Sequence, residues 1–407
     1  MRKKIFIFSL VFALLILGAV FVNQRFFGNS EEILPIETPA PTPGSPEEED
    51  NPEEYYPDDD IYIGDIPYYE YDEPIVFDGD TESPWHPIHF TEIRTPQPLH
   101  PGVPHGYISQ RHIRYLNDNF YSRFPFSYQE KRAAAWIIEE LLAIGYTWDN
   151  IQVQEFDLES LEVPIERITW SDGFVINHDY NYMRSTYTSQ NVILTVPGRS
   201  EQVIVVGAHY DTVLYPGASD NASGTALLLE SAQRMRYVDN YYTIVYVFFG
   251  AEEIGLYGAE VFVWSLTEEE HDSILFMVNA DVLFEGPYFI FGGGYGNRWG
   301  PRVANSNDIS RQWEEMAEYL NVNHGTELIS DPYAIFLSSD QLVFLEVGHT
   351  VMMLFGTDFH ADGSHNFRVF HSYRDCYHYI NNRWPYKIGD AMRNFNIFLE
   401  RVLLAEY

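Results

Sequence analysis

The sequence predicts an α/β fold with three layers, in which helices cover both faces of a mixed, mainly parallel central sheet. Two observations predict this fold. Short runs rich in β-branched residues, such as QNVILTV (190–196) and QVIVVGAH (202–209), have the length and composition of buried strands. Runs with helical periodicity, such as residues 221–238, alternate with such strands along the chain. In sheets of this kind, ligands bind at the carboxyl ends of the strands.

The other elements follow in order from the same two patterns. Residues 127–146 carry an apolar stripe at helical spacing, with Ser127 as a cap and Gly145 near the end. The Gly-rich stretch 291–297 lacks the Lys-Ser/Thr pair of a phosphate loop, so we expect a turn or a flexible cleft wall there. Further strands are expected at 241–253, 273–282 and 349–355, and further helices at 255–266, 311–322 and about 386–405.

Charge and cysteine content exclude some classes of function. The 407 residues include 60 acidic and 24 basic ones, a formal charge of −36, which argues against nucleic acid as a partner. Cys376 is the only cysteine, so the chain has no intramolecular disulfide. Any metal site would therefore use histidines and carboxylates.

The chain is expected to have three parts. In residues 1–27, the basic residues Arg2 to Lys4 precede an apolar run from Ile5 to Val22, which favours a single-pass membrane anchor with the body on the extracellular face. The alternative is a cleaved signal segment and secretion. Residues 28–104, acidic and Pro-rich at first, are expected to form a disordered stalk and lead-in. The folded domain is expected at 105–407.

Charged residues end three of the expected strands. His209 and Asp211 follow one apolar run, Glu252 and Glu253 another, and Asp281 a third. A buried carboxylate costs several kcal/mol unless it is paired or coordinated. Lys and Arg are nearly absent nearby, so a divalent cation is the obvious counter-charge. Mixed imidazole and carboxylate ligation favours Zn²⁺, for which Mn²⁺ or Co²⁺ could substitute.

Each of these motifs also has a structural interpretation. His209 and Asp211 could end a strand, and SDNASG, which contains Asp220, could be only a helix cap. Their joint occurrence at strand ends favours a metal site instead. A two-metal hydrolytic site would use one glutamate of the pair as a ligand and the other as a base, and spacing alone does not say which is which.

Four segments, GAHYDTV, PGASDNASGTALLLE, GAEEIGLYGAE and NAD, occur in this order and together resemble a known family. It is the secreted or surface zinc aminopeptidases with two co-catalytic metals, MH clan metallopeptidases that include aminopeptidase S, aminopeptidase Y and the bacterial leucyl aminopeptidases. The likeness runs from about Ser127 to the C-terminus. It implies the zinc-dependent exopeptidase fold, two zinc ions per chain, and hydrolysis of N-terminal residues from peptides.

The resemblance also implies a role for each site residue. Glu252 would be the general base, and Asp211 would orient the imidazole of His209. Asp340, in SSDQLVF, would be structural or stand behind the ligands. The implied metal ligands are His209, Asp220 as the bridge, Glu253, Asp281 and His371.

The last histidine is the least constrained of these residues. The family pattern places Asp four residues after it, and His371 with Asp375 meets that requirement. His365 is the alternative in a segment crowded with histidines. Phe370 stands where some relatives carry a tyrosine that could donate a hydrogen bond to the reaction intermediate.

Two other functions are compatible with the sequence. Glutaminyl cyclases share the expected fold but use one zinc ion, and some relatives of the fold are non-catalytic surface receptors or adhesins. The complete ligand set favours an aminopeptidase acting on peptides with a free N-terminus. The sequence does not indicate the oligomeric state or the preferred N-terminal side chain.

Overall fold

The computed structural model describes residues 102–157, 188–295, 303–304, 307–361, 363–384 and 387–407. The expected membrane anchor at 1–27 lies outside these residues, as does nearly all of the expected stalk. In the described ranges, no helix combines the length and the apolar character needed to cross a bilayer.

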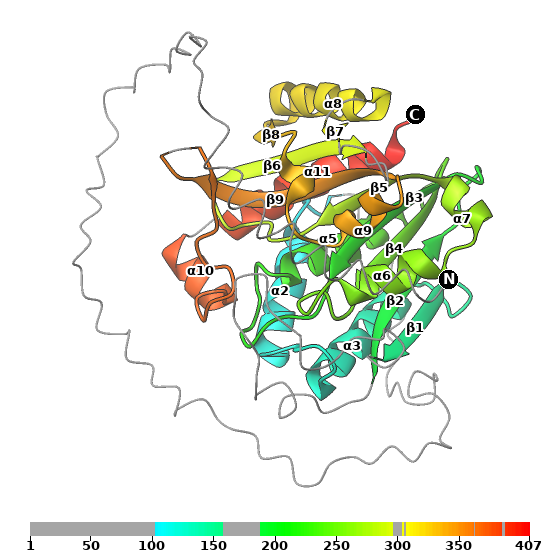
Figure 1. The fold of residues 1–407 in the computed structure, drawn as a ribbon. Helices are drawn as coiled ribbons and strands as arrows, with labels where there is room; N and C mark the ends of the chain where they lie inside the picture. The colour runs from blue at the N-terminus through cyan, green and yellow to red at the C-terminus, as the bar shows by residue number, and fades with distance from the viewer. Residues whose placement is uncertain (1–101, 158–187, 296–302, 305–306, 362, 385–386) are drawn as a thin grey trace, which may run out of the picture. The chain divides into compact units, whose positions relative to one another are not determined.

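One mixed sheet forms the centre of the fold, as predicted. Its main path runs β1-β2-β4-β3-β5-β9-β6-β7, while β8 pairs with β6 and β10 with β9 (Figure 1). Parallel pairing joins β4, β3, β5 and β9 at the centre and also links β6 to β8, whereas the other neighbours are antiparallel. The strands are β1 (Ile151–Asp157), β2 (Thr188–Val196), β3 (Val203–His209), β4 (Thr243–Phe249), β5 (Ile274–Ala280), β6 (Tyr288–Tyr295), β7 (Val303–Ala304), β8 (Leu328–Ser330), β9 (Thr350–Phe359) and β10 (His365–Asn366).

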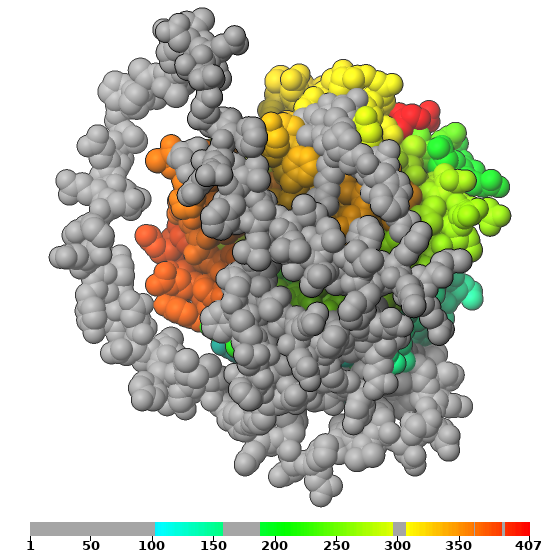
Figure 2. Space-filling model, in the orientation of Figure 1, coloured from blue at the N-terminus to red at the C-terminus, as the bar shows by residue number. Residues whose placement is uncertain are grey.

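Helices pack on both faces of the sheet, which confirms the three-layer prediction. One apolar core joins the sheet to α2 (Tyr107–Asn119), α3 (Tyr128–Ile144), α5 (Ala222–Met235), α8 (Asp308–His324) and α11 (Lys387–Leu404). A second core on the opposite face joins it to α6 (Tyr257–Ser265) and α9 (Gln341–Glu346). The other helices in the described residues are α7 (Glu268–Ser273), α10 (Tyr377–Arg383) and the 3-10 turn Ala334–Phe336. Figure 2 shows α8 (yellow) and the segment of α10 (orange-red) at the surface.

Alternation along the central strands explains the two cores. In β3, Ile204, Val206 and Ala208 face the core that contains α5, whereas Val205 faces the core that contains α6. Side chains of a strand point alternately to the two faces, so a strand covered on both sides is apolar at every position. This is why the sequence shows an unbroken apolar run before His209.

In the Gly-rich stretch 291–297, where the sequence predicts a turn or a flexible cleft wall, the described residues form a strand. Its residues from Phe291 to Tyr295 belong to β6, in the interior of the sheet. A Cβ atom on Gly292 would lie 2.1 Å from the carbonyl oxygen of Asp331, and one on Gly293 would lie 2.6 Å from the ring of Trp313. The glycines therefore allow close packing against this strand rather than flexibility.

Candidate metal centre

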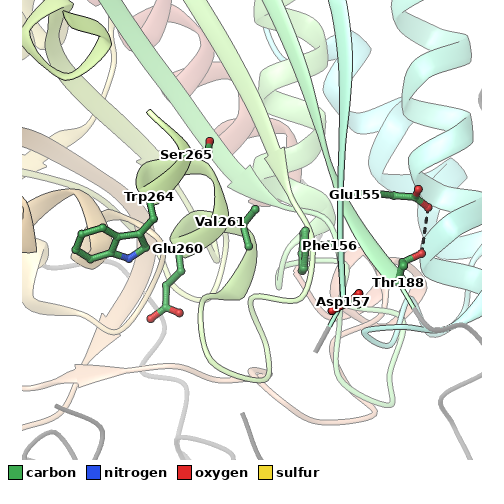
Figure 3. Close-up of a pocket in the computed structure, with 8 residues that line it drawn as sticks. All are labelled: Glu155, Phe156, Asp157, Thr188, Glu260, Val261, Trp264 and Ser265. Carbon is green, nitrogen blue, oxygen red and sulfur yellow. Dashed lines mark hydrogen bonds between the residues drawn. The ribbon is translucent and has the colours of Figure 1, made fainter. Parts of the chain in front are cut away.

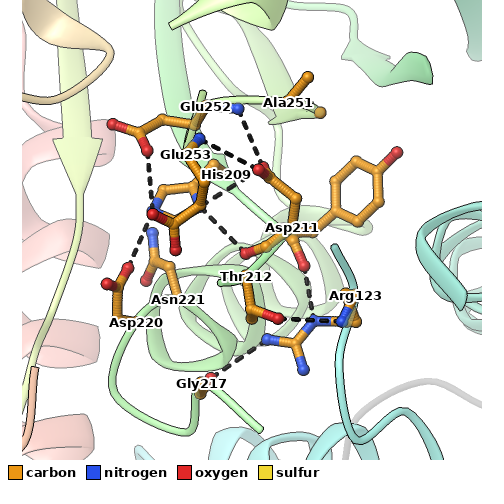
Figure 4. Close-up of polar contacts among 12 residues, drawn as sticks. Arg123, His209, Asp211, Thr212, Gly217, Asp220, Asn221, Ala251, Glu252 and Glu253 are labelled. Atoms are coloured by element: carbon orange, nitrogen blue, oxygen red, sulfur yellow. Dashed lines mark hydrogen bonds and ion pairs between the residues drawn. The ribbon is translucent and has the colours of Figure 1, made fainter. Parts of the chain in front are cut away.

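The carboxyl ends of β4, β3 and β5 meet because these strands are adjacent and parallel. His209 is the last residue of β3, opposite Phe249 at the end of β4. Glu252 and Glu253 follow β4 within a few residues, and Asp281 follows β5 directly. The strand order therefore gathers side chains that are far apart in the sequence (Figure 4).

The first donor group consists of His209, Asp220 and Asp281. The Nε2 atom of His209 lies 3.1 Å from Oδ1 of Asp220 and 3.2 Å from Oδ1 of Asp281. All three residues are buried. A single imidazole nitrogen thus faces two carboxylates from two other parts of the chain.

The second donor group consists of Asp220, Glu253 and His371. The Nε2 atom of His371 lies 3.2 Å from Oδ2 of Asp220 and 3.1 Å from Oε2 of Glu253. His371 comes from the segment between β10 and α10. In the described part of the chain, these two are the groups of His, Cys, Asp and Glu with ligand atoms close enough to hold a metal ion.

Asp220 belongs to both groups, with one oxygen turned to each histidine. Its position follows from the start of α5, where Asn221 is the N-cap and its Oδ1 accepts from the amide of Gly224 at 2.8 Å. Asp375 holds the same turn, because its carboxylate accepts from the amides of Ser219 at 2.6 Å and Asp220 at 2.9 Å. The segment SDNASG is therefore both a helix cap and part of a donor cluster.

The site concentrates negative charge out of contact with water. Burial works against charging either histidine, yet the neighbouring carboxylates raise the pKa of His209 well above its usual value and that of His371 to about 12. Burial, followed by the charge of Asp220, raises the pKa of Glu253 to about 7. Neighbouring acids contribute to all three shifts, and their surplus of negative charge favours any nearby cation.

The donor chemistry of the two groups fits metal ions. Each group offers one imidazole nitrogen and two carboxylate oxygens, and one carboxylate is common to both. Imidazole with carboxylate is a donor set typical of zinc, and a shared carboxylate can serve two ions at once. The residues present could therefore hold one ion in each group.

Glu252 lies beside both groups but belongs to neither. Its Oε2 is 4.0 Å from Nε2 of His209, and burial raises its pKa well above the usual value, with Asp340 and Glu253 adding to the rise. The structure thus separates the two glutamates that spacing could not distinguish. Glu253 lies in a group that could hold a metal ion, and Glu252 lies in neither group.

Asp211 links the end of β3, at His209, to the turn that follows β4 and carries Glu252 and Glu253. Its Oδ1 lies 3.5 Å from Nδ1 of His209, whose Nδ1 also lies 3.2 Å from the carbonyl oxygen of Asp211. The same carboxylate accepts from the amides of Glu252 and Glu253, each at 3.1 Å (Figure 4). Asp211 therefore contacts the histidine of the first group and the backbone that carries both glutamates.

The remaining candidates lie outside the two groups. His365 pairs with Asp331 at 3.1 Å instead. Asp340 is fully buried, and neither of its carboxylate oxygens has a hydrogen-bond partner among the described residues. The ring of Phe370 stacks on that of His371, with the ring centroids 3.7 Å apart, and cannot donate a hydrogen bond. Cys376 is half-buried at the start of α10.

Sequence reasoning did not identify Arg123, which is fully buried beside the site. Its guanidinium donates to the carbonyl oxygens of Tyr210 at 2.6 Å, Pro216 at 2.8 Å and Gly217 at 3.1 Å (Figure 4). These contacts hold the loop that connects His209 to the turn at Asp220. Burial lowers the pKa of Arg123 to about 10, although the surrounding acids favour its charge. No local pattern in YSRFPF distinguishes this arginine from a surface one.

A separate hollow of about 570 Å³ lies between the β1–β2 edge and α6 (Figure 3). Its lining includes Phe156, Trp264 and Glu260, and no member of either donor group. Burial and the charge of Glu346 raise the pKa of Glu260 to about 7. This hollow is chemically distinct from the metal centre.

Comparisons with known proteins assign the chain to a family. The sequence model described as Peptidase family M28 matches residues 191–396. Aminopeptidase YwaD of Bacillus subtilis is 42% identical over 87 residues, which cover 20% of this chain and 19% of that protein. Probable lipoprotein aminopeptidase LpqL of Mycobacterium tuberculosis is 33% identical over 135 residues, or 30% of this chain and 27% of that protein. The matched regions thus span less than a third of these relatives.

Solved structures show the same fold at low sequence identity. BSAP, a zinc aminopeptidase from Bacillus subtilis, superposes with a TM-score of 0.55 at 16% identity, over 74% of this chain and 96% of that chain. A glutaminyl cyclase from an Acidobacteriales bacterium superposes with a TM-score of 0.51 at 19% identity, over 76% of this chain and 97% of that chain. The fold is therefore common to proteins of both names, and the site residues must decide between them.

Proposed function

The chain belongs to peptidase family M28, and from this premise we propose that it is a zinc-dependent aminopeptidase with two metal ions. The observation that carries the proposal is the place of Asp220, whose two carboxylate oxygens face two separate donor groups. His209 and Asp281 would complete the first site. Glu253 and His371 would complete the second.

The chain's own residues would carry the proton transfers of peptide hydrolysis. Zinc, when bound, would supply Lewis-acid polarisation of the scissile carbonyl and lower the pKa of the attacking water. Glu252 would accept a proton from that water and pass it to the nitrogen of the departing amine as the C–N bond breaks. Asp211 would keep the His209 ring oriented and hold the Glu252 backbone at a constant distance from it.

The acidic surroundings also support a preference for peptides with a free N-terminus. Several buried acids face the same space, and a substrate α-ammonium group would add a positive charge there. An N-acetylated peptide lacks that charge. We expect at least tenfold faster hydrolysis of the free peptide, and equal rates would remove electrostatic capture as the basis of end specificity.

The proposed setting of the enzyme rests on its N-terminal segments. We propose a catalytic domain at 105–407, an acidic stalk at 28–104 and a single-pass anchor at 1–27, with the active site on the extracellular face. Secretion after cleavage of the first segment is the alternative. One relative is called a probable lipoprotein aminopeptidase, a name that agrees with a surface location.

The decisive experiment compares the full-length chain with its Glu252→Gln variant. We expect two zinc ions per wild-type chain and turnover of aminoacyl p-nitroanilides, and a loss of kcat of about 10²- to 10⁴-fold in the variant. The variant should retain both zinc ions, because Glu252 belongs to neither donor group. Loss of one zinc would instead exchange the roles of Glu252 and Glu253.

The same preparation tests the other two functions. One zinc per chain, together with cyclisation of N-terminal glutamine, would favour a glutaminyl cyclase. A zinc-loaded protein that is inactive on a panel of aminoacyl amides would favour a surface receptor or adhesin. The two complete donor groups favour the aminopeptidase over both.

A further inference from the structure

The turn from Gly250 to Glu253 presents four consecutive backbone N–H groups to side-chain oxygens. The acceptors are Asn191, Glu130 and Asp211, and all three are fully buried. These contacts therefore tie the backbone of the turn to three side chains from other parts of the fold. The contacts run from Gly250 N to Asn191 Oδ1 (3.1 Å), Ala251 N to Glu130 Oε1 (3.2 Å), Glu252 N to Asp211 Oδ1 (3.1 Å) and Glu253 N to Asp211 Oδ2 (3.1 Å).

Glu130 lies in the first turn of α3, and its side chain contacts both β2 and this turn. Its Oε2 accepts from the amide of Phe126 at 2.6 Å, and its Oε1 accepts from the hydroxyl of Ser189 at 2.6 Å. The amide of Ala251 is the third donor to the same carboxylate. The carboxylate is therefore held by Phe126, just before α3, and by Ser189 of β2, as well as by the turn.

Ala251 needs such a contact because its backbone is left-handed, with φ of 54°. An L-residue in that region costs about 1–2 kcal/mol relative to the ordinary helical region. The preceding residue lies close against β2, since a Cβ atom on Gly250 would lie 2.5 Å from the carbonyl oxygen of Gln190. A turn of this kind persists only where its surroundings hold it.

We propose that Glu130 is a positioning residue for the acidic pair Glu252–Glu253: by holding the Ala251 amide, it sets where both glutamates stand relative to the metal centre. Its link to catalysis rests on the proposed function. Its link to metal binding rests only on the donor group that contains Glu253. Glu130 itself is in neither group and acts through the backbone.

The test replaces Glu130 by glutamine in the full-length chain. Glutamine has nearly the same shape but puts an NH₂ group where one oxygen was, and the two backbone groups that bond to the carboxylate, the amides of Phe126 and Ala251, are both donors. If the amide oxygen keeps the shorter Phe126 contact, the NH₂ group faces the Ala251 amide and that bond is lost. Glu139→Gln is the matched control, because Glu139 is exposed on the same helix.

We expect two linked effects in Glu130→Gln. The kcat for an aminoacyl p-nitroanilide should fall by about 10²-fold with a small change in KM, because the base is displaced rather than removed. One zinc equivalent should bind about 10- to 100-fold more weakly in a competition titration, while the other is unchanged. Glu139→Gln should match the wild type in both measurements.

A second substitution separates positioning from ordinary stabilisation. Glycine adopts positive φ freely, so Ala251→Gly lets the turn form without the help of Glu130. In the Glu130→Gln background, Ala251→Gly should restore kcat and the weakened zinc equivalent by about tenfold. A purely structural Glu130 would lower the melting temperature with no selective loss of zinc and no rescue, and that result would overturn the proposal.

The remaining outcomes are also decisive. If Glu130→Gln does not fold, as judged by circular dichroism, Glu130→Asp shortens the side chain but keeps the charge, and it should show the same selective effects. Wild-type kcat and zinc binding in a folded Glu130 variant would refute the inference. If the wild type hydrolyses no aminoacyl substrate, the proposed function fails, and the zinc titration still tests the positioning role.

Discussion

The two donor groups share Asp220 but are built in different ways. His209 ends β3 and Asp281 follows β5 directly, so the hydrogen bonds of the sheet place the first group. Glu253 and His371 lie in turns, and His371 has a left-handed backbone with φ of 51°. The second group therefore depends on side chains that hold the backbone, which makes it the part more easily disturbed by distant substitutions.

Glu285 shows this dependence most clearly, because it clamps the backbone just before His371 by two hydrogen bonds. Glu285 is buried, and its Oε2 accepts from the amides of Val369 at 2.8 Å and Phe370 at 3.2 Å, just before His371. Burial is the main reason that the pKa of Glu285 rises to about 7. No equivalent clamp is needed at His209, whose amide belongs to a paired strand.

The largest effect is expected where the two groups meet. Asp220→Asn replaces one of the two charged oxygens that face His209 and His371 by an amide NH₂. We expect both zinc ions to bind weakly and turnover to fall to background, measured by metal analysis after dialysis and by p-nitroanilide hydrolysis. A variant that kept one tightly bound zinc would mean that the groups are independent and that Asp220 is not a bridge.

The difference between the two donor groups also explains which site residues could be predicted from the sequence. Charged residues after long apolar runs predict that His209, Glu253 and Asp281 lie close together, because strand ends of a parallel sheet must lie side by side. His371 could be chosen only through a family resemblance. Glu130, Asn191 and Glu285 could not be found, since each acts on backbone groups far away in the chain.

The sequence prediction for residues 291–297 was wrong for the described residues 291–295 for the same physical reason, since the role of these glycines depends on residues far away in the chain. Glycine is typical of turns, but in β6 it is required by the approach of Trp313 and by the Asp331 carbonyl group, and neither approach is visible locally. The fold class, by contrast, follows from periodicity that extends over whole elements. Long regular patterns are therefore more informative than single residues whose role depends on tertiary neighbours.

A substitution that disturbs only the second donor group should have a smaller effect. Glu285→Gln keeps the shape of the clamp but introduces a donor opposite the amides of Val369 and Phe370. We expect about tenfold weaker binding of one zinc equivalent and a similar loss of kcat, with the other equivalent unchanged. Glu318→Gln, an exposed site on α8, is the control. If both zinc ions were bound equally more weakly, the second group would not depend more than the first on side chains that hold its backbone.

The smallest effect on the metal centre, no change in zinc binding, is expected for an acid in neither group. Glu260, beside the hollow in Figure 3, has its pKa raised from 4.5 to about 7 by burial and by Glu346, and no metal donor group includes it. The folded state therefore holds this proton more tightly than the unfolded state does. Stability contributed by the neutral form is present below about pH 4.5 and is lost as pH rises through about 7.

The Glu260→Gln variant should not show this loss of stability at high pH, and it should bind zinc as the wild type does. We expect the variant to be more stable than the wild type by about 1–3 kcal/mol at pH 8 and nearly equal to it at pH 4.5, by denaturant unfolding at constant zinc. Exposed Glu268→Gln on α7 should show no such pH-dependent difference. A variant less stable than the wild type at pH 8 would mean that the Glu260 carboxylate has a cationic partner in the folded state. Glu260 would then resemble the acids of the two donor groups, which lie buried around sites that could hold a cation.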